Sequence, residues 1–159
     1  MKTTKKYAKY FVSETCAPFT SPVQIKMIED QKKAGNFVNL APQYYINDEK
    51  VKGSFFMMNT WTVSLNGTKP VKLELAHTHD YAEILGFMGS NVNDVTELGG
   101  EIEIWLEGER YIITKSFLVF IPQGMKHCPI IIRKVDRPFL GYAVGLTGRY
   151  SVAWQEEYN

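Results

Sequence analysis

Short runs of alternating apolar and polar residues recur along most of the chain, separated by turn-forming residues. The clearest are residues 71–75 and 101–106, in which every second side chain is aliphatic. Residues 117–121 are continuously apolar, and residues 54–65 favour a strand that ends before the turn at Asn66-Gly67. A period of two is typical of a strand with one buried face. The spacing predicts roughly eight or nine short strands, the pattern of an all-β sandwich or barrel.

One segment departs from this pattern and predicts a short helix over residues 22–34. Ser21 is suited to cap its first turn, with Pro22 at the first helical position and Gln24 completing a capping box. The helix is expected to end at Gly35. Its predicted apolar face consists of Val23, Met27 and Ile28.

The predicted elements divide the chain into one barrel and two flanking segments. We expect residues 1–53 to form an N-terminal extension that carries the short helix and packs on the barrel. Residues 54–146 hold most of the predicted strands and form the barrel itself, and residues 147–159 form a C-terminal tail. A chain of 159 residues is long enough for one domain with a sizeable core.

All three histidines of the chain fall into one candidate site. His77 and His79 are two residues apart, so in a strand they share a face with the aliphatic side chains of residues 71–75. Two imidazoles on an interior face are unfavourable unless a partner satisfies them, and a divalent metal ion does so. Glu83 falls on the same face of an unbroken strand, and His127 would complete the set from a distant strand.

Each of these residues also has a simpler explanation. A single interior histidine is more often hydrogen-bonded in the core than bound to a metal, and Glu83 could instead be a solvated strand residue. The metal site is favoured because every histidine of the chain fits one ligand pattern. Strand alternation places Cys128 beside His127 but pointing outward, and it places Glu101 and Glu103 on a solvent face.

The spacing of these residues resembles that of the cupin superfamily. The run from His77 to Glu83 matches the ligand positions of the first cupin motif, and the run from Pro122 to His127 matches the second. The resemblance covers about residues 54–146 and is to single-domain, metal-binding cupins of the "cupin 2" type. It implies a double-stranded β-helix, or jelly roll, with a metal near one mouth of the barrel.

Three imidazole nitrogens and one carboxylate leave open positions on a divalent metal ion that prefers a high coordination number. Fe, Mn or Ni suits such a site best, and Zn also fits. The resemblance then implies an enzyme of the dioxygenase, decarboxylase, isomerase or lyase type that acts on a small oxygenated molecule. The alternatives are a non-catalytic module that binds a small ligand or metal, and a metal that only stabilises the barrel.

An apolar pocket beside the metal is expected to hold the small-molecule ligand. Its predicted lining is Leu73, Leu75, Leu85, Phe87 and Met125. Tyr81 is the one predicted catalytic side chain, because Asp80 should point away from the site and no further histidine exists to act as a base. The apolar run from Phe55 to Trp61, together with the N-terminal segment, predicts a homodimer.

The composition of the chain predicts which other partners it has and in which cellular compartment it lies. The formal net charge of +1 gives no general attraction to nucleic acid or anionic membranes. The sequence contains no run of about 18 apolar residues, so no transmembrane helix is predicted. Charges interrupt the N-terminal residues too early for a signal peptide. We therefore expect a cytoplasmic protein with no nucleic-acid or membrane partner. Its two cysteines, Cys16 and Cys128, are expected to be free thiols.

Overall fold

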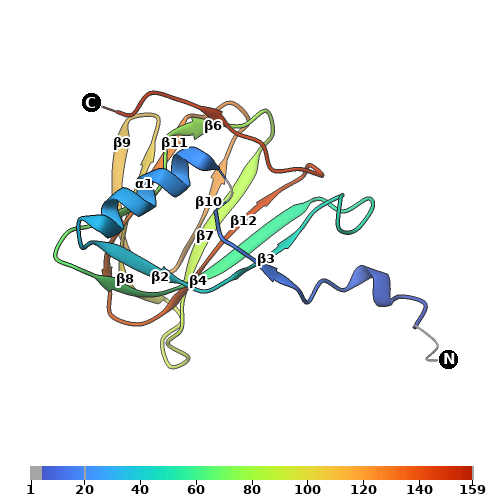
Figure 1. Cartoon of the computed structure of the whole chain (residues 1–159), viewed down its shortest axis with the longest axis horizontal. Helices are drawn as coiled ribbons and strands as arrows, with labels where there is room; N and C mark the ends of the chain where they lie inside the picture. The colour runs from blue at the N-terminus through green and yellow to red at the C-terminus, as the bar shows by residue number, and fades with distance from the viewer. Residues whose placement is uncertain (1–4, 20, 159) are drawn as a thin grey trace.

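Two antiparallel β-sheets packed face to face, with one short helix, make up the computed structural model, which describes residues 5–19 and 21–158 (Figure 1). The seven-stranded sheet contains β1 (Thr15–Cys16), β2 (Phe37–Leu40), β3 (Gln43–Ile46), β4 (Phe56–Asn66), β7 (Glu83–Gly89), β10 (Phe117–Ile121) and β12 (Phe139–Gly145). The six-stranded sheet contains β5 (Val71–Glu74), β6 (His77–Thr78), β8 (Glu97–Leu106), β9 (Glu109–Lys115), β11 (His127–Val135) and β13 (Ala153–Trp154). The predicted all-β jelly-roll class is confirmed.

From β4 onward the chain passes repeatedly from one sheet to the other. Strands β4, β7, β10 and β12 lie in the seven-stranded sheet, and the strands between them lie in the six-stranded sheet. Residues that are far apart in the sequence therefore face one another across the interior. The core of that interior consists of aliphatic and aromatic side chains, including Phe56, Leu98, Ile102, Ile104, Ile121, Ile132 and Phe139.

The predicted helix is confirmed as α1 (Pro22–Lys33), which lies along β5 and β2. Its Gln31 amide forms two hydrogen bonds to the edge of β5: Nε2 donates to the main-chain oxygen of Lys72, and Oε1 accepts from the main-chain N–H of Lys72, both at 2.8 Å. The predicted capping box is wrong, because the Ser21 side chain makes no capping hydrogen bond. The predicted apolar face is also wrong in part, since Val23 is exposed and Gln24 is buried.

The N-terminal segment joins the seven-stranded sheet through β1, β2 and β3, and residues 5–11 extend away from the sandwich (Figure 1). A short 3-10 helix, η1 (Ala8–Tyr10), lies in this extended part. Residues 1–4 of the predicted extension and residue 159 of the predicted tail lie outside the described residues. Among the described residues, no helix is both long and apolar enough to cross a membrane.

The prediction that Glu103 faces solvent is wrong. Its side chain is 5% exposed, accepts a hydrogen bond from Trp105 Nε1 at 2.8 Å and accepts another from Arg133 Nη1 at 2.8 Å. The ring of Tyr158, near the end of the chain, stacks on Trp105 with centroids 5.4 Å apart. The C-terminal segment thus covers a strand face that alternation alone assigned to water.

Candidate metal centre

The four predicted ligands, His77, His79, Glu83 and His127, come together between the two sheets, and each is 5% exposed or less. His77 opens β6 and His127 opens β11, and the two residues are direct partners across that antiparallel pair. Glu83 lies on the opposite sheet, where it is the first residue of β7. The unbroken strand assumed in the sequence is therefore wrong: the chain leaves the six-stranded sheet after Thr78 and re-enters the site from the facing one.

Main-chain carbonyl groups fix the orientation of all three imidazoles. Each Nδ1 lies within hydrogen-bonding distance of a carbonyl oxygen. The pairs are His77 with Leu75 at 2.7 Å, His79 with Ser151 at 2.5 Å and His127 with Met125 at 3.0 Å. A carbonyl oxygen only accepts hydrogen bonds, so Nδ1 carries a proton. In the neutral ring, Nε2 then keeps its lone pair free. This is the tautomer that a metal-binding histidine needs when it ligates through Nε2.

The three Nε2 atoms converge with the carboxylate of Glu83. His77 Nε2 lies 3.2 Å from His79 Nε2, and Glu83 Oε2 lies 3.5 Å from Nε2 of both His79 and His127. His127 Nε2 is buried and makes no hydrogen bond to any described residue. Facing lone pairs repel one another unless a proton or a cation lies between them. The donor set therefore fits a divalent metal ion.

Burial and contacts within the cluster shift the pKa values of His77 and Glu83. It lowers the pKa of His77 to about 3, with the neighbouring His127 acting in the same direction, so the His77 ring is neutral near pH 7. Burial alone raises the pKa of Glu83, but hydrogen bonds and charge interactions with His127 and His79, in the state in which Nε2 of these rings carries a proton, outweigh it and lower that pKa to about 2. Glu83 is therefore ionised and supplies the negative charge that a cation at this position requires.

Cys128 belongs to the same cluster, and the prediction that it points outward is wrong. Its side chain is 1% exposed, and its sulfur lies within 4.8 Å of a ring nitrogen of both His77 and His127. The strand register shifts between His127 and Ile130, and Cys128 has a φ of 66°. The bulge interrupts strand alternation and turns two consecutive side chains to the interior. Burial raises the pKa of the Cys128 thiol well above its ordinary value.

A cavity of about 260 Å³ extends from the histidine cluster through the interior of the sandwich. Three predicted pocket residues, Leu73, Leu85 and Phe87, line it, whereas Leu75 and Met125 do not. The N-terminal segment closes part of it with Cys16, Pro18 and Phe19. Sequence reasoning missed this contribution, because the segment has no periodic pattern that ties it to the barrel.

Tyr81 lies outside the residues that line the cavity. Its hydroxyl donates to the main-chain oxygen of Ser151 at 3.0 Å and accepts from the main-chain N–H of Ser151 at 3.2 Å. Its ring stacks on His79, with centroids 4.6 Å apart. This placement suits a residue that positions His79, and a catalytic role for Tyr81 stays a prediction.

The polar residues that line the cavity and that the sequence did not single out include Glu74 and Tyr150. Glu74 Oε1 accepts hydrogen bonds from Gln24 Nε2 at 2.7 Å and from the main-chain N–H of Leu75 at 3.1 Å. Burial raises the pKa of Glu74 to about 8, so its carboxyl is protonated near pH 7. Tyr150 packs the edge of its ring against His79, and burial raises its pKa. No local motif distinguishes either residue, because both are placed by contacts distant in sequence.

Similarity to known proteins is found in the fold and not in the sequence. No family model matches the sequence, and no curated protein matches it. Among solved structures, the fold is similar to an oxalate oxidase in complex with the substrate analogue glycolate, with a TM-score of 0.51 and 10% identity over 92% of this chain. This chain spans 63% of the oxalate oxidase chain. The polyketide cyclase RemF from Streptomyces resistomycificus has a TM-score of 0.44 and 16% identity, over 72% of this chain and 70% of that one.

At such low identity, a structural likeness establishes the fold alone. The fold is that of the cupins, as the histidine motifs predicted. The protein is therefore a cupin-fold chain with a buried cluster of histidine, glutamate and cysteine side chains that could hold a metal ion.

Proposed function

We propose that this protein is a metal-dependent enzyme that acts on a small oxygenated organic molecule. The observation that carries the proposal is the convergence of three oriented imidazoles and one carboxylate at a cavity. A purely structural metal site is usually closed by its protein ligands. Here the cluster borders a space large enough for a small ligand to approach.

A single divalent cation would be held by Nε2 of the three histidines and by the carboxylate of Glu83. Fe, Mn or Ni suits this nitrogen-rich donor set with open positions, and Zn also fits. When bound, such a metal supplies Lewis acidity or redox chemistry at the oxygen atoms of a substrate. The protein holds the imidazoles in one tautomer through their Nδ1 hydrogen bonds, and the surrounding apolar side chains exclude water.

The cavity lining restricts the ligand to one polar end. Most of the lining is apolar or aromatic, and none of the described lining residues is a lysine or an arginine. A second carboxylate on the ligand would find no positive partner away from the metal and would be unfavourably desolvated. We therefore expect a neutral or singly charged chelating molecule, such as a monocarboxylate or a diketone, with an apolar remainder. Glu74 and Tyr150 offer hydrogen bonds to its polar end.

The test is a ligand screen on metal-loaded protein. Chelating monocarboxylates, dicarboxylates and diketones are compared by thermal shift, with His127→Ala protein as the matched control, and each stabilising compound is incubated and analysed for products. We expect monocarboxylates or diketones to raise the melting temperature of the wild type alone, because the ligand needs the metal, and at least one to be converted.

The remaining outcomes separate the alternatives. Ligand binding without conversion would identify a non-catalytic binding module. Loss of stability on chelation, with no ligand bound, would mean that the metal only joins the two sheets. Preferential binding of dicarboxylates would contradict the argument from a lining without lysine or arginine among its described residues.

A further inference from the structure

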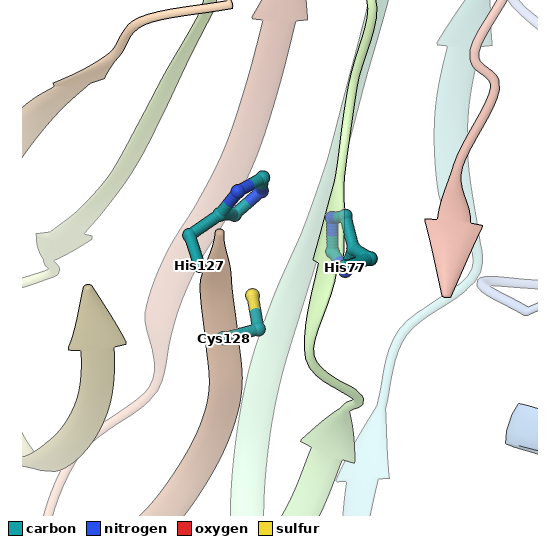
Figure 2. Close-up of side chains that lie close together, drawn as sticks. All are labelled: His77, His127 and Cys128. Carbon is teal, nitrogen blue, oxygen red and sulfur yellow. The ribbon is translucent and has the colours of Figure 1, made fainter. Parts of the chain in front are cut away.

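Two overlapping groups of donor atoms share His127. One group is His79, Glu83 and His127, and the other is His77, His127 and Cys128, with the donor atoms of each group within 4.8 Å of one another. Figure 2 shows the sulfur of Cys128 pointing toward the space between the rings of His127 and His77. The first group ends in a hard carboxylate oxygen and the second in a soft sulfur. The cluster therefore offers two chemically different faces to a cation.

The position of the sulfur depends on an unusual backbone conformation. Cys128 is one of two non-glycine residues with a positive φ among the described residues. A side chain in the left-handed region costs about 1–3 kcal/mol, and such residues are concentrated at functional sites. A regular strand would have directed Cys128 away from His127. The bulge instead holds the thiol beside His127. A cysteine that only fills space in the core does not require this conformation.

A second observation points to a ligand at this place. His127 Nε2 is buried with no hydrogen-bond partner in the described structure, and His127 is the residue common to both groups. His77 directs its Nε2 to the same interior, because its Nδ1 is held by the carbonyl of Leu75. Two nitrogen donors and one sulfur thus lie close together, and one of them, His127 Nε2, has no hydrogen-bond partner among the described residues.

We propose that Cys128 is a metal ligand, and that His77, His127 and Cys128 form a thiolate-containing position for borderline or soft cations such as Zn²⁺ or Co²⁺. The inference rests on the proposed metal centre and deepens it. On binding, the sulfur donates an electron pair to the cation, and the thiol proton leaves to solvent, with no change of oxidation state. Sulfur with two imidazoles is a donor set typical of four-coordinate zinc.

The test uses cobalt, because a cobalt–thiolate bond gives an intense charge-transfer absorption in the near ultraviolet that nitrogen and oxygen ligands do not give. Metal-free wild type, Cys16→Ser and Cys128→Ser proteins are titrated with Co²⁺ and followed by absorption. We expect the band in the wild type and in Cys16→Ser, in which Cys128 is the only cysteine left. In Cys128→Ser the band should be absent while cobalt still binds through the histidines.

Each outcome has a defined meaning. Cobalt binding without the band in Cys16→Ser contradicts the thiolate ligand but leaves the proposed metal centre intact, and this arm does not depend on whether Cys128→Ser folds. Persistence of the band in Cys128→Ser also contradicts the inference. A wild type that binds no cobalt contradicts both the metal centre and the thiolate ligand.

A separate feature, the outer face of the seven-stranded sheet, is apolar over four adjacent strands. Six large side chains on it are 37–64% exposed: Met57, Trp61, Ile84, Met88, Leu118 and Phe120. The register places Phe120 beside Ile84 on β7, and Ile84 beside Val144 on β12, so one apolar row crosses the sheet. Strands β4, β7, β10 and β12 contain one charged residue, Glu83, and its side chain points inward.

We infer that this outer sheet face joins two copies of the chain. A fully exposed large apolar side chain presents roughly 150–250 Å², so the six half-exposed residues offer on the order of 600 Å². Half-buried neighbours on β12 add to this area, which approaches the ~800 Å² that each partner buries in a standard interface. A surface without charge of either sign is complementary to itself, and two such faces can pack as aligned sheets.

The oligomeric state tests this inference. Wild-type protein, Phe120→Glu and the exposed-loop control Val92→Glu are compared by sedimentation velocity over a range of concentrations. We expect dimers in the wild type and the control, and at least a tenfold weaker association in Phe120→Glu, because each dimer would bury two unpaired carboxylates. A wild type that stays monomeric, or that binds lipid vesicles through this face as a monomer, would contradict the inference.

Discussion

Alanine in place of His127 is expected to empty the metal centre. Wild-type protein should carry about one equivalent of a divalent metal, and the variant almost none. His127 is the donor shared by both groups of ligand atoms, so its loss leaves neither group complete. Changes that only disturb the orientation of a ligand lower metal affinity by about 10–100-fold, so removal of this ligand should lower it by more than about 100-fold. Elemental analysis and calorimetric titration of both proteins measure the effect.

Tyr111→Phe is the matched control for His127→Ala. It removes the hydroxyl of an exposed side chain that is hydrogen-bonded to Glu109 and lies outside the cluster and the cavity lining. Its metal content should equal that of the wild type. Iron, manganese or nickel in the wild type would support redox or Lewis-acid catalysis, and zinc alone would favour lyase, hydrolytic or structural roles. A full equivalent of metal in His127→Ala would show that the cluster is not the binding site.

The second large effect is expected for Glu74→Gln, and it concerns stability. The folded-state pKa of Glu74 is about 8, raised by burial above an ordinary value of 4.5. Between these values the folded protein keeps the carboxyl proton and the unfolded chain releases it. Stability therefore falls as pH rises through this window, by on the order of 2–4 kcal/mol, and the loss is complete above about pH 8.

Glutamine at position 74 removes this titration and keeps an oxygen that accepts from Gln24 and from the main chain of Leu75. We expect metal-free Glu74→Gln to match the wild type near pH 5 and to exceed its free energy of unfolding by on the order of 2–4 kcal/mol near pH 8. Urea unfolding at both pH values measures this difference. Glu29→Gln, an exposed substitution on α1, is the control and should leave the wild-type profile unchanged. Equal stability of Glu74→Gln and wild type at pH 8 would contradict the buried, neutral carboxyl.

The sequence indicated the fold and the principal donors because both depend on local signals. Alternation between apolar and polar residues identifies strands, and histidines two residues apart on such a strand share a face. Glu83 was placed inside for an incomplete reason, since spacing alone does not show that the chain changes sheets after Thr78. The prediction held because the crossing returns this residue to the same interior.

The contributions that escaped prediction arise from irregular backbone or from distant contacts. Cys128 turns inward at a bulge that no alternating pattern reveals. Glu103 is buried because Arg133 pairs with it and the C-terminal segment covers the strand beside it. Glu74 becomes a neutral polar group in the cavity because tertiary packing buries it, which outweighs the opposing effect of the hydrogen bond from Gln24 of α1. Each depends on tertiary packing, which a single sequence encodes only indirectly.

The contact between Gln31 and β5 has a consequence for assembly of the protein. A primary amide has the same donor and acceptor groups as a peptide unit, and the Gln31 amide occupies both main-chain positions of Lys72 that a neighbouring strand would use. Strand β5 pairs with β11 along its other edge, so this amide terminates the hydrogen-bond ladder on that side. Unprotected edges invite strand addition by other molecules, the first step of sheet-mediated aggregation. A single glutamine on α1 thus protects this edge against cross-chain β-pairing.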